Sequence, residues 1–135
     1  MVQLDDRFIE AVYTVTQMIP KGQVATYGQV ATYVVSPRYA RAVGRALKHL
    51  DRKRAKVVPW QRVINASGRI SARGDIERPT RQRKLLEKEG IVFTESGRVN
   101  LAVFGWAGPP PTWRPPYADP APAKNRRRAG RTRTG

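Results

Sequence analysis

The chain has 135 residues, a length that suits one domain. Its 26 lysines and arginines stand against 10 acids, and the formal net charge of +16 favours a polyanionic partner, nucleic acid before an acidic membrane. The sequence has no cysteine and a single histidine, His49, which excludes disulfides, thiolate zinc sites, cysteine nucleophiles and a histidine metal cluster.

The first predicted element is a helix that has Asp5 or Asp6 as its N-cap and ends before Pro20. Its apolar residues recur at helical spacing and predict one buried face, made of Phe8, Ile9, Val12, Val15 and Ile19. The segment 1–20 carries acids early and has no long apolar run, so it predicts neither a signal peptide nor a membrane span. We therefore expect a cytoplasmic protein, associated with the nucleoid in a bacterium or placed in the nucleus of a eukaryote.

Two further helices are predicted close together. Thr26 is the expected N-cap of a short helix over 27–34, and Ser36-Pro37 is a second start signal, for a helix over residues 37–50. The apolar residues of this second helix share one face: Tyr39, Val43, Ala46, Leu47 and Leu50. Its basic residues share another: Arg38, Arg41, Arg45 and Lys48, called the basic row below. Two short helices with a tight connection and a basic second helix are typical of a helix-turn-helix.

Short strands are expected at 57–58, 62–65 and 69–71, with a turn over 65–68 between the last two. A further helix begins at Pro79 or Thr80 and is closed by Gly90 just after its C-cap. A hairpin over 90–101 completes the domain. A helix-turn-helix with flanking strands indicates an α+β winged helix, which we assign to residues 1–106.

The composition changes near Ala107. Residues 107–135 hold seven of the eleven prolines and then an arginine-rich run, and seven basic residues against one acid give this tail +6 of the total +16. The remaining +10 lies in residues 1–106, so the domain is basic without the tail. The tail has too few apolar residues to offset its ordering entropy, and we expect it to be disordered and to add non-specific attraction to phosphates.

Four sequence motifs occur together in order: IPKGQVATYGQVA, SPRYARAVGRAL, PWQRVINASGRIS and LLEKEGI. Over roughly residues 8–101 this set resembles the C-terminal, DNA-binding domain of the O6-alkylguanine-DNA alkyltransferases. The Pro-Cys-His-Arg-Val signature of that family is matched here by Pro59, Trp60, Gln61, Arg62 and Val63. Tryptophan in place of cysteine marks the alkyltransferase-like members of the family. The resemblance implies binding of O6-alkylguanine in duplex DNA and transfer of the lesion to nucleotide excision repair proteins, with no alkyl transfer.

Gln61 is a second departure from the transferase pattern. The histidine that the transferases have there helps to activate the thiol through a water, whereas glutamine can hold a hydrogen bond but is not a base near neutral pH. Both the nucleophile and its activator are therefore missing, and the family's dealkylation has no chemical route. We expect no enzymatic activity, no cofactor, no metal and no membrane partner, and a monomeric protein.

The resemblance also assigns roles in DNA binding. Tyr27 would crowd the phosphate 3′ of the target and rotate it, while Arg41 would enter the base stack in place of the flipped guanine. The family lays this helix in the minor groove, where small residues let the backbone approach DNA: Ala40, Ala42 and Gly44. The rest of the basic row would contact phosphates without reading sequence: Arg38, Arg45 and Lys48.

The flipped base needs a pocket, for which Pro59 and Trp60 would form one wall, with Val63 anchoring the strand beneath. Arg73 matches an arginine that some alkyltransferase-like proteins place over the flipped base, where a guanidinium over a π face is stabilising.

Three residues have expected supporting roles. Arg62 and Asn65 would tie the strand to the helix-turn-helix, as in the family. Glu89 matches the glutamate that orients the transferase histidine, and beside Gln61 it would be a supporting partner or a helix-end residue.

Two other functions compete with this interpretation. A plain winged-helix regulator would read DNA sequence in the major groove. A glycosylase would use Asp75, near the expected pocket, as its base.

Overall fold

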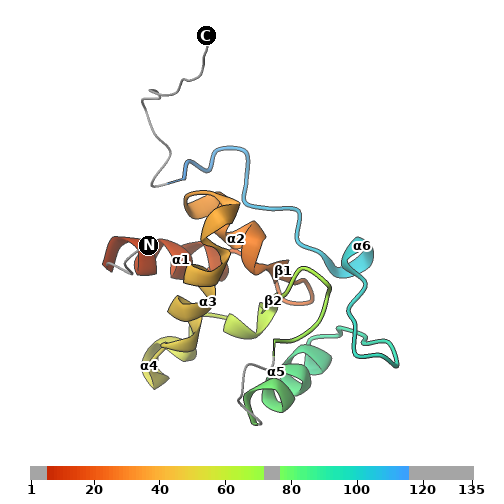
Figure 1. The fold of residues 1–135 in the computed structure, drawn as a ribbon. Coiled ribbons are helices and arrows are strands. Elements are labelled where there is room, and N and C mark those ends of the chain that lie inside the picture. The colour runs from red at the N-terminus through yellow and green to blue at the C-terminus, as the bar shows by residue number, and fades with distance from the viewer. Residues whose placement is uncertain (1–5, 72–76, 116–135) are drawn as a thin grey trace.

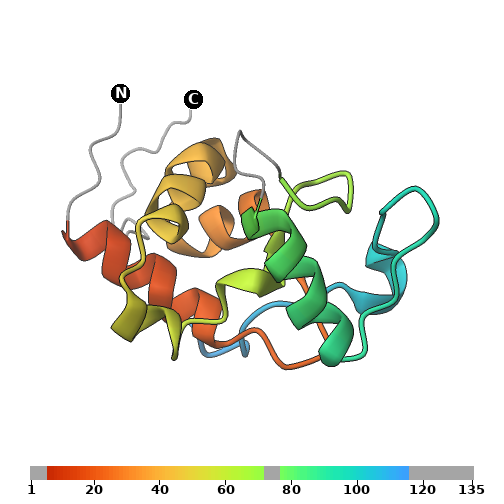
Figure 2. The same ribbon diagram turned by 90° about the horizontal axis from the view of Figure 1, so that it is seen from below.

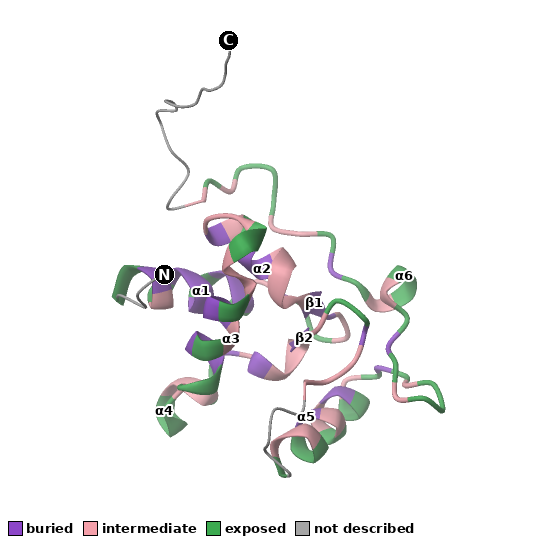
Figure 3. Cartoon of the chain, viewed as in Figure 1, coloured by how far each residue is buried: buried purple, intermediate pink, exposed green. Residues whose placement is uncertain are grey.

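The computed structural model describes residues 6–71 and 77–115. Its first layer is helical, with α1 (Asp6–Gln17) packed against α2 (Tyr27–Val34) and α3 (Ala40–Lys48) (Figure 1). The periodicity of α1 predicted its buried face correctly at Phe8, Val12 and Val15, and Ile9 is half-buried. In Figure 3 the buried residues gather where these three helices face one another. None of the helices in the described ranges is long and apolar enough to cross a membrane.

Local capping chemistry sets where α2 and the 3-10 turn before α3 begin. The Thr26 hydroxyl accepts a hydrogen bond from the Gln29 N–H at 3.0 Å, as predicted. The next helix differs from its prediction, because Ser36 caps a single 3-10 turn, η1 (Pro37–Tyr39), before the α-helix begins at Ala40. Only two residues separate α2 from η1, and a 3-10 turn winds more tightly than an α-turn.

The end of α3 also comes earlier than predicted, at Lys48 instead of residue 50. The guanidinium of Arg78 donates to the carbonyl oxygens of Leu47 at 3.1 Å and Lys48 at 3.4 Å. These carbonyls are among those that a helix end leaves without intrahelical partners, so a cation there satisfies them and favours termination.

The sheet is much smaller than predicted. Strand β1 (Ala25–Thr26) pairs in parallel with β2 (Val63–Ile64), so that Ala25 lies opposite Val63. The strand predicted at 57–58 is wrong, because that segment is a turn after the short helix α4 (Arg52–Ala55) and leads into a 3-10 turn, η2 (Trp60–Arg62). The strand predicted at 69–71 is also absent from the described residues; the Asn65 N–H donates to the Arg69 carbonyl at 3.0 Å and closes the predicted turn.

Helix α5 (Glu77–Lys88) begins earlier than predicted, because Pro79 lies in its first turn, where a missing N–H costs nothing. Its end was predicted correctly: Gly90 has a φ of +96°, and the Ile91 N–H donates to the Leu86 carbonyl at 3.0 Å. The hairpin predicted over 90–101 is reduced to one antiparallel bridge, between Phe93 and Val99. Its last residue instead begins a short helix, α6 (Leu101–Phe104).

Helices α1 and α5 lie on either side of the segment that carries η2 and β2 (Figure 2). A second apolar cluster forms under α5 and is made of Val24, Ile64, Leu86, Ile91 and Val99. The η2–β2 segment is thus enclosed between two packed layers.

The packed chain continues past the boundary predicted at residue 106. Trp106 is buried and meets Tyr33 edge to face, with ring centroids 5.8 Å apart. Seven residues later the Trp113 indole N–H donates to the Tyr33 carbonyl at 3.1 Å. Residues 107–113 therefore form a strap on α2, so the contacts of the domain reach into the segment predicted as tail. Residues 116–135 lie outside the described part, and their disorder stays a prediction.

An ion pair ties η2 to the loops at the ends of α1 and α5. Arg62 Nε donates to Glu89 Oε1 at 2.9 Å, and Arg62 Nη1 donates to the Ile19 carbonyl at 2.8 Å. These bonds run to the end of α5 and to the loop after α1, not to the helix-turn-helix as predicted. Asn65 also departs from its expected role: its Oδ1 accepts hydrogen bonds from Ser67 and Arg69 and organises its own turn.

The protonation state of Glu89 is set by this contact. Burial by itself would raise the pKa of the Glu89 carboxyl, but hydrogen bonds from Arg62 and Gln61 and the charge of Arg62 hold that pKa below its ordinary value. A carboxyl with a lowered pKa in the folded state stabilises the fold while it is ionised. The stabilisation is complete above the ordinary pKa of 4.5 and is lost as the pH falls through the lowered value.

We predict that Glu89→Gln lowers the free energy of unfolding at neutral pH by about 1.5–3 kcal/mol, because it replaces a charge-assisted hydrogen-bond acceptor. The deficit should shrink in acid, where the wild-type carboxyl is itself protonated. Urea denaturation at neutral pH and through the acid range measures both effects. Glu87→Gln is the matched control, since Glu87 forms a half-exposed pair with Arg83 on the same helix and should change stability by no more than about 0.5 kcal/mol. Equal losses of unfolding free energy in the two variants would contradict the stabilising role of the contact between Arg62 and Glu89.

Candidate nucleic-acid interface

The basic row forms one exposed face of η1 and α3. All four of its side chains are exposed, whereas the opposite face of α3 is buried against α1 and α2. Within residues 6–71 and 77–115, no carboxylate forms an ion pair with any member of the row. Four uncompensated cations on one surface attract a phosphate backbone.

Tyr27 lies on this same pair of helices. It is the first residue of α2, held there by the Thr26 cap, and it is half-buried. Two ring carbons of Tyr27 lie 3.8 Å from the place that a Cβ on Gly44 would occupy, so the ring rests against α3. The structure thus brings Tyr27 beside the helix that carries Arg41, Arg45 and Lys48.

The small residues around Arg41 do not all face outward. Ala40 and Gly44 are partly exposed, but Ala42 is 4% exposed and packs in the core. A methyl group added to Gly44 would make only ordinary van der Waals contact with Tyr27, so the free fold tolerates alanine at this position. Close approach of a ligand to the helix backbone is therefore possible at Ala40 and Gly44 and not at Ala42.

Trp60 begins η2 and is nearly buried, with 9% of its surface exposed. The guanidinium carbons of Arg78 and Arg81 lie 4.5 Å and 5.7 Å from the centroid of its ring. The backbone that follows is fixed by Gln82, whose side-chain amide donates to the Gln61 carbonyl at 3.1 Å and the Val63 carbonyl at 3.0 Å.

These α5 residues were missed in the sequence analysis. Arg78, Arg81 and Gln82 recur at helical spacing, so the pattern places them on one face of a helix. Nothing local shows that this polar face turns toward Trp60, because that depends on tertiary packing.

A cavity of about 370 Å³, called the Trp60 cavity, opens beside the indole. Pro59, Trp60 and Gln61 line it together with Gln17 of α1 and Leu85 of α5. Two of the four predicted pocket residues thus share one cavity.

The other two predicted pocket residues do not line the Trp60 cavity. Val63 is fully buried in β2 and supports the segment from the core. Arg73 lies outside the described residues, as does Asp75.

Among the described residues that line the Trp60 cavity there is no carboxylate, histidine or hydroxyl group, and its charged residues are Lys56 and Arg62. The Gln61 side-chain amide donates to Glu89 Oε2 at 2.9 Å, and the lowered pKa of Glu89 keeps this carboxyl ionised. Glu89 thus contacts Gln61 and Arg62, and its predicted supporting role stays a prediction. No group of three or more His, Cys, Asp or Glu residues in the described part of the chain could hold a metal ion.

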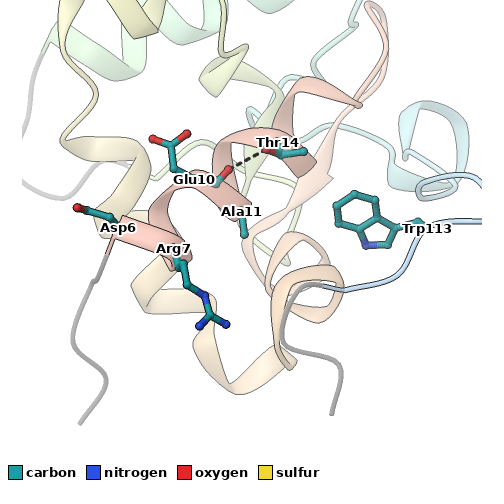
Figure 4. A pocket seen from close by; sticks show the side chains of 6 residues that line it. All are labelled: Asp6, Arg7, Glu10, Ala11, Thr14 and Trp113. Carbon is teal, nitrogen blue, oxygen red and sulfur yellow. Dashed lines mark hydrogen bonds between the residues drawn. The ribbon is translucent and has the colours of Figure 1, made fainter. Parts of the chain in front are cut away.

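A second cavity, of about 400 Å³, lies between α1 and the strap (Figure 4). It shares no lining residue with the Trp60 cavity, and its lining includes Trp113 and two carboxylates, Asp6 and Glu10. Arg7 is the one basic residue among its described lining residues, so acids outnumber bases and this cavity does not extend the basic surface.

The chain was then compared with known proteins. The family model for the DNA-binding domain of 6-O-methylguanine DNA methyltransferase matches residues 7–91. A "DNA base-flipping protein" of Vibrio parahaemolyticus is 42% identical over 102 residues, which cover 75% of this chain and 97% of that protein. "Alkyltransferase-like protein 1" of Schizosaccharomyces pombe is 42% identical over 105 residues, which cover 75% of this chain and 95% of that one.

Solved structures agree with the sequence comparison. The S. pombe alkyltransferase-like protein, in complex with damaged DNA containing O6-carboxymethylguanine, has a TM-score of 0.67 at 42% identity, over 77% of this chain and 98% of its own. The O6-methylguanine methyltransferase of Mycobacterium tuberculosis has a TM-score of 0.53 at 33% identity, over 77% of this chain and 58% of its own. The predicted α+β winged-helix class and the predicted resemblance are confirmed. The chain belongs to the family of the 6-O-methylguanine DNA methyltransferase DNA-binding domain, and within it to the alkyltransferase-like, base-flipping proteins.

Proposed function

We propose that this protein binds O6-alkylguanine in duplex DNA, flips the damaged nucleotide out of the stack and passes the lesion to nucleotide excision repair proteins without removing the alkyl group. One observation carries the proposal: Trp60 lies at the edge of a cavity in a chain that has no cysteine. The resemblance to the Pro-Cys-His-Arg-Val signature implies that this is the position of the transferase nucleophile. A relative with 42% identity has been solved on DNA that contains an O6-alkylated guanine, which supports the same ligand class here.

The basic row supplies the attraction to DNA. Each cation that neutralises a phosphate releases condensed counterions, so binding to undamaged duplex is expected to be weak and strongly dependent on salt. Phosphate contacts position the protein without reading the sequence, which suits a protein that must search any sequence for damage.

Flipping requires a side chain that pushes and another that fills the gap, at a cost of a few kcal/mol for unstacking and unpairing. In this proposal Tyr27, which is held at the start of α2 against α3, presses on the backbone of the DNA. Arg41, which is exposed early in α3 on the same face as the rest of the basic row, enters the stack.

The Trp60 cavity receives the flipped base in this proposal. The indole presents a rigid apolar surface to an alkyl group, and Pro59 continues that surface. Gln61 is held by Glu89 as a hydrogen-bonding amide, and the chain has no cysteine that could accept the alkyl group. The alkylated base therefore stays intact, and repair must follow from other proteins at the DNA.

We predict tighter binding to a duplex containing O6-methylguanine than to the same duplex with guanine, since only the flipped lesion fills the cavity. After incubation the methyl group should be recovered on guanine in full. Equilibrium binding and mass spectrometry of the recovered DNA and protein make the two measurements. Equal affinity for both duplexes would overturn the proposal, and selection of a preferred sequence from undamaged DNA would favour the winged-helix regulator instead. Release of free base would favour the glycosylase.

Alanine substitutions of Arg41 and Arg38 should have different effects on DNA binding. We expect Arg41→Ala to weaken lesion binding by roughly 30-fold, because a side chain that fills the vacated stack is a central contact worth about 2 kcal/mol or more. Arg38→Ala should instead weaken binding to damaged and undamaged duplexes alike and lower the slope of log K against log salt by about 1. Titrations of both duplexes at several salt concentrations separate the effects, and identical behaviour of the two variants would remove the wedge role of Arg41.

A further inference from the structure

Arg78 joins two parts of the molecule that the proposed function needs to keep in register. It is the second residue of α5, and its guanidinium carbon lies 4.5 Å from the centroid of the Trp60 ring. The same guanidinium donates to the carbonyls of Leu47 at 3.1 Å and Lys48 at 3.4 Å, the last two residues of α3. One side chain therefore touches both the wall of the Trp60 cavity and the end of the DNA-binding helix.

We propose that Arg78 is a positioning residue for lesion recognition, which sets the distance between the Trp60 indole and the C-terminal end of α3. This inference rests on the proposed function, because that distance matters only if a nucleotide must pass from DNA docked on α3 to the Trp60 cavity. A base rotated out of a duplex travels a fixed path, so a wall that is misplaced by a small amount loses contact with it.

The chemistry of the contact is specific to arginine. The planar guanidinium can stack on an indole with its face while its N–H groups point outward in the plane toward two carbonyls. The C-terminal end of a helix carries a partial negative charge, which attracts the cation to the same place. Lysine keeps the charge but is a compact ammonium, so it cannot present a flat face and a fork together.

The two segments that Arg78 touches are each held in place by another hydrogen-bonding side chain. The Tyr13 hydroxyl holds α3 to α1 by donating to the Ala46 carbonyl at 3.0 Å, one residue before Leu47. Gln82, one turn after Arg78, holds the backbone on both sides of Arg62. Arg78 links these two supports and covers one face of the indole.

The experiment compares Arg78→Lys and Arg78→Met with wild type, using as readout the ratio of the dissociation constants for undamaged and O6-methylguanine duplexes. Both variants should lower this ratio, by about 2- to 30-fold if the loss equals the stabilisation of a guanidinium over an indole. Arg78→Lys keeps the charge, so its affinity for undamaged duplex should stay within about twofold of wild type.

Arg83→Met is the matched control. Arg83 lies on the same helix with its guanidinium carbon 4.5 Å from the Phe93 ring centroid, and its partner is Glu87. The substitution Arg83→Met therefore removes an equivalent charge and ring contact without touching Trp60 or α3. The ratio of the two dissociation constants should stay as in wild type.

A second readout needs no DNA. The indole N–H resonance of Trp60, assigned with Trp60→Phe, should shift in both Arg78 variants and stay in place in Arg83→Met. A wild-type ratio in Arg78→Lys and Arg78→Met, or an unmoved indole resonance, would overturn the role of Arg78. A wild-type protein with a ratio of one would instead overturn the proposed function, and the resonance would then decide alone whether Arg78 holds the indole. Circular dichroism identifies a variant that fails to fold. If Arg78→Met does not fold, Arg78→Lys, which is the smaller change, is sufficient for the test.

Discussion

The contact between Arg62 and Glu89 is the interaction on which the arrangement of the site depends. Both side chains are largely withdrawn from water, with 17% and 10% of their surfaces exposed, so each needs the other as a partner. Arg62 also reaches the Ile19 carbonyl, and Glu89 also accepts a hydrogen bond from the Gly22 N–H at 3.4 Å. The pair therefore fixes η2 against the loop after α1 and the end of α5 at once.

Because these bonds fix the backbone of η2, that backbone does not depend on which side chain stands at position 60. At that position this chain has Trp60, which lies between the main core and the face of α5. Gln82 supplies the hydrogen bonds that the turn needs on either side of Arg62. The same backbone arrangement therefore holds an indole at the edge of the Trp60 cavity, which agrees with the proposed binding of a lesion without alkyl transfer.

Features of the fold that depend on local interactions could be predicted from the sequence, whereas features that depend on long-range contacts could not. Thr26 and Gly90 were predicted correctly as helix boundaries, because a cap hydroxyl and a left-handed glycine act within a few residues. The strands were predicted too long, because pairing between Ala25 and Val63 joins segments far apart in sequence and extends for two residues only. The strap was missed since its proline content resembles that of a disordered tail, while a single indole, Trp113, suffices to dock it on α2.

The candidate site divides in the same way. The exposed row on α3 could be found from helical periodicity, and the family motifs pointed to Tyr27 and Trp60, whose roles stay predictions. Arg78 had no such signal, because its function depends on which face of α5 turns toward η2. Polar residues that support a site through tertiary contacts are thus the part that a single sequence conceals, whereas the residues proposed to touch the ligand belong to recognisable motifs.

In the proposed function the Trp60 cavity holds an intact alkyl group. A duplex with a ¹³C-labelled methyl on O6-methylguanine, bound to the protein and observed by NMR, tests this most directly. The methyl signal should keep the shift range of an O-methyl group over the whole measurement and show nuclear Overhauser contacts to the indole protons of Trp60. A methyl signal that transfers to protein, or that retains the contacts of the stacked lesion in free duplex, would contradict it.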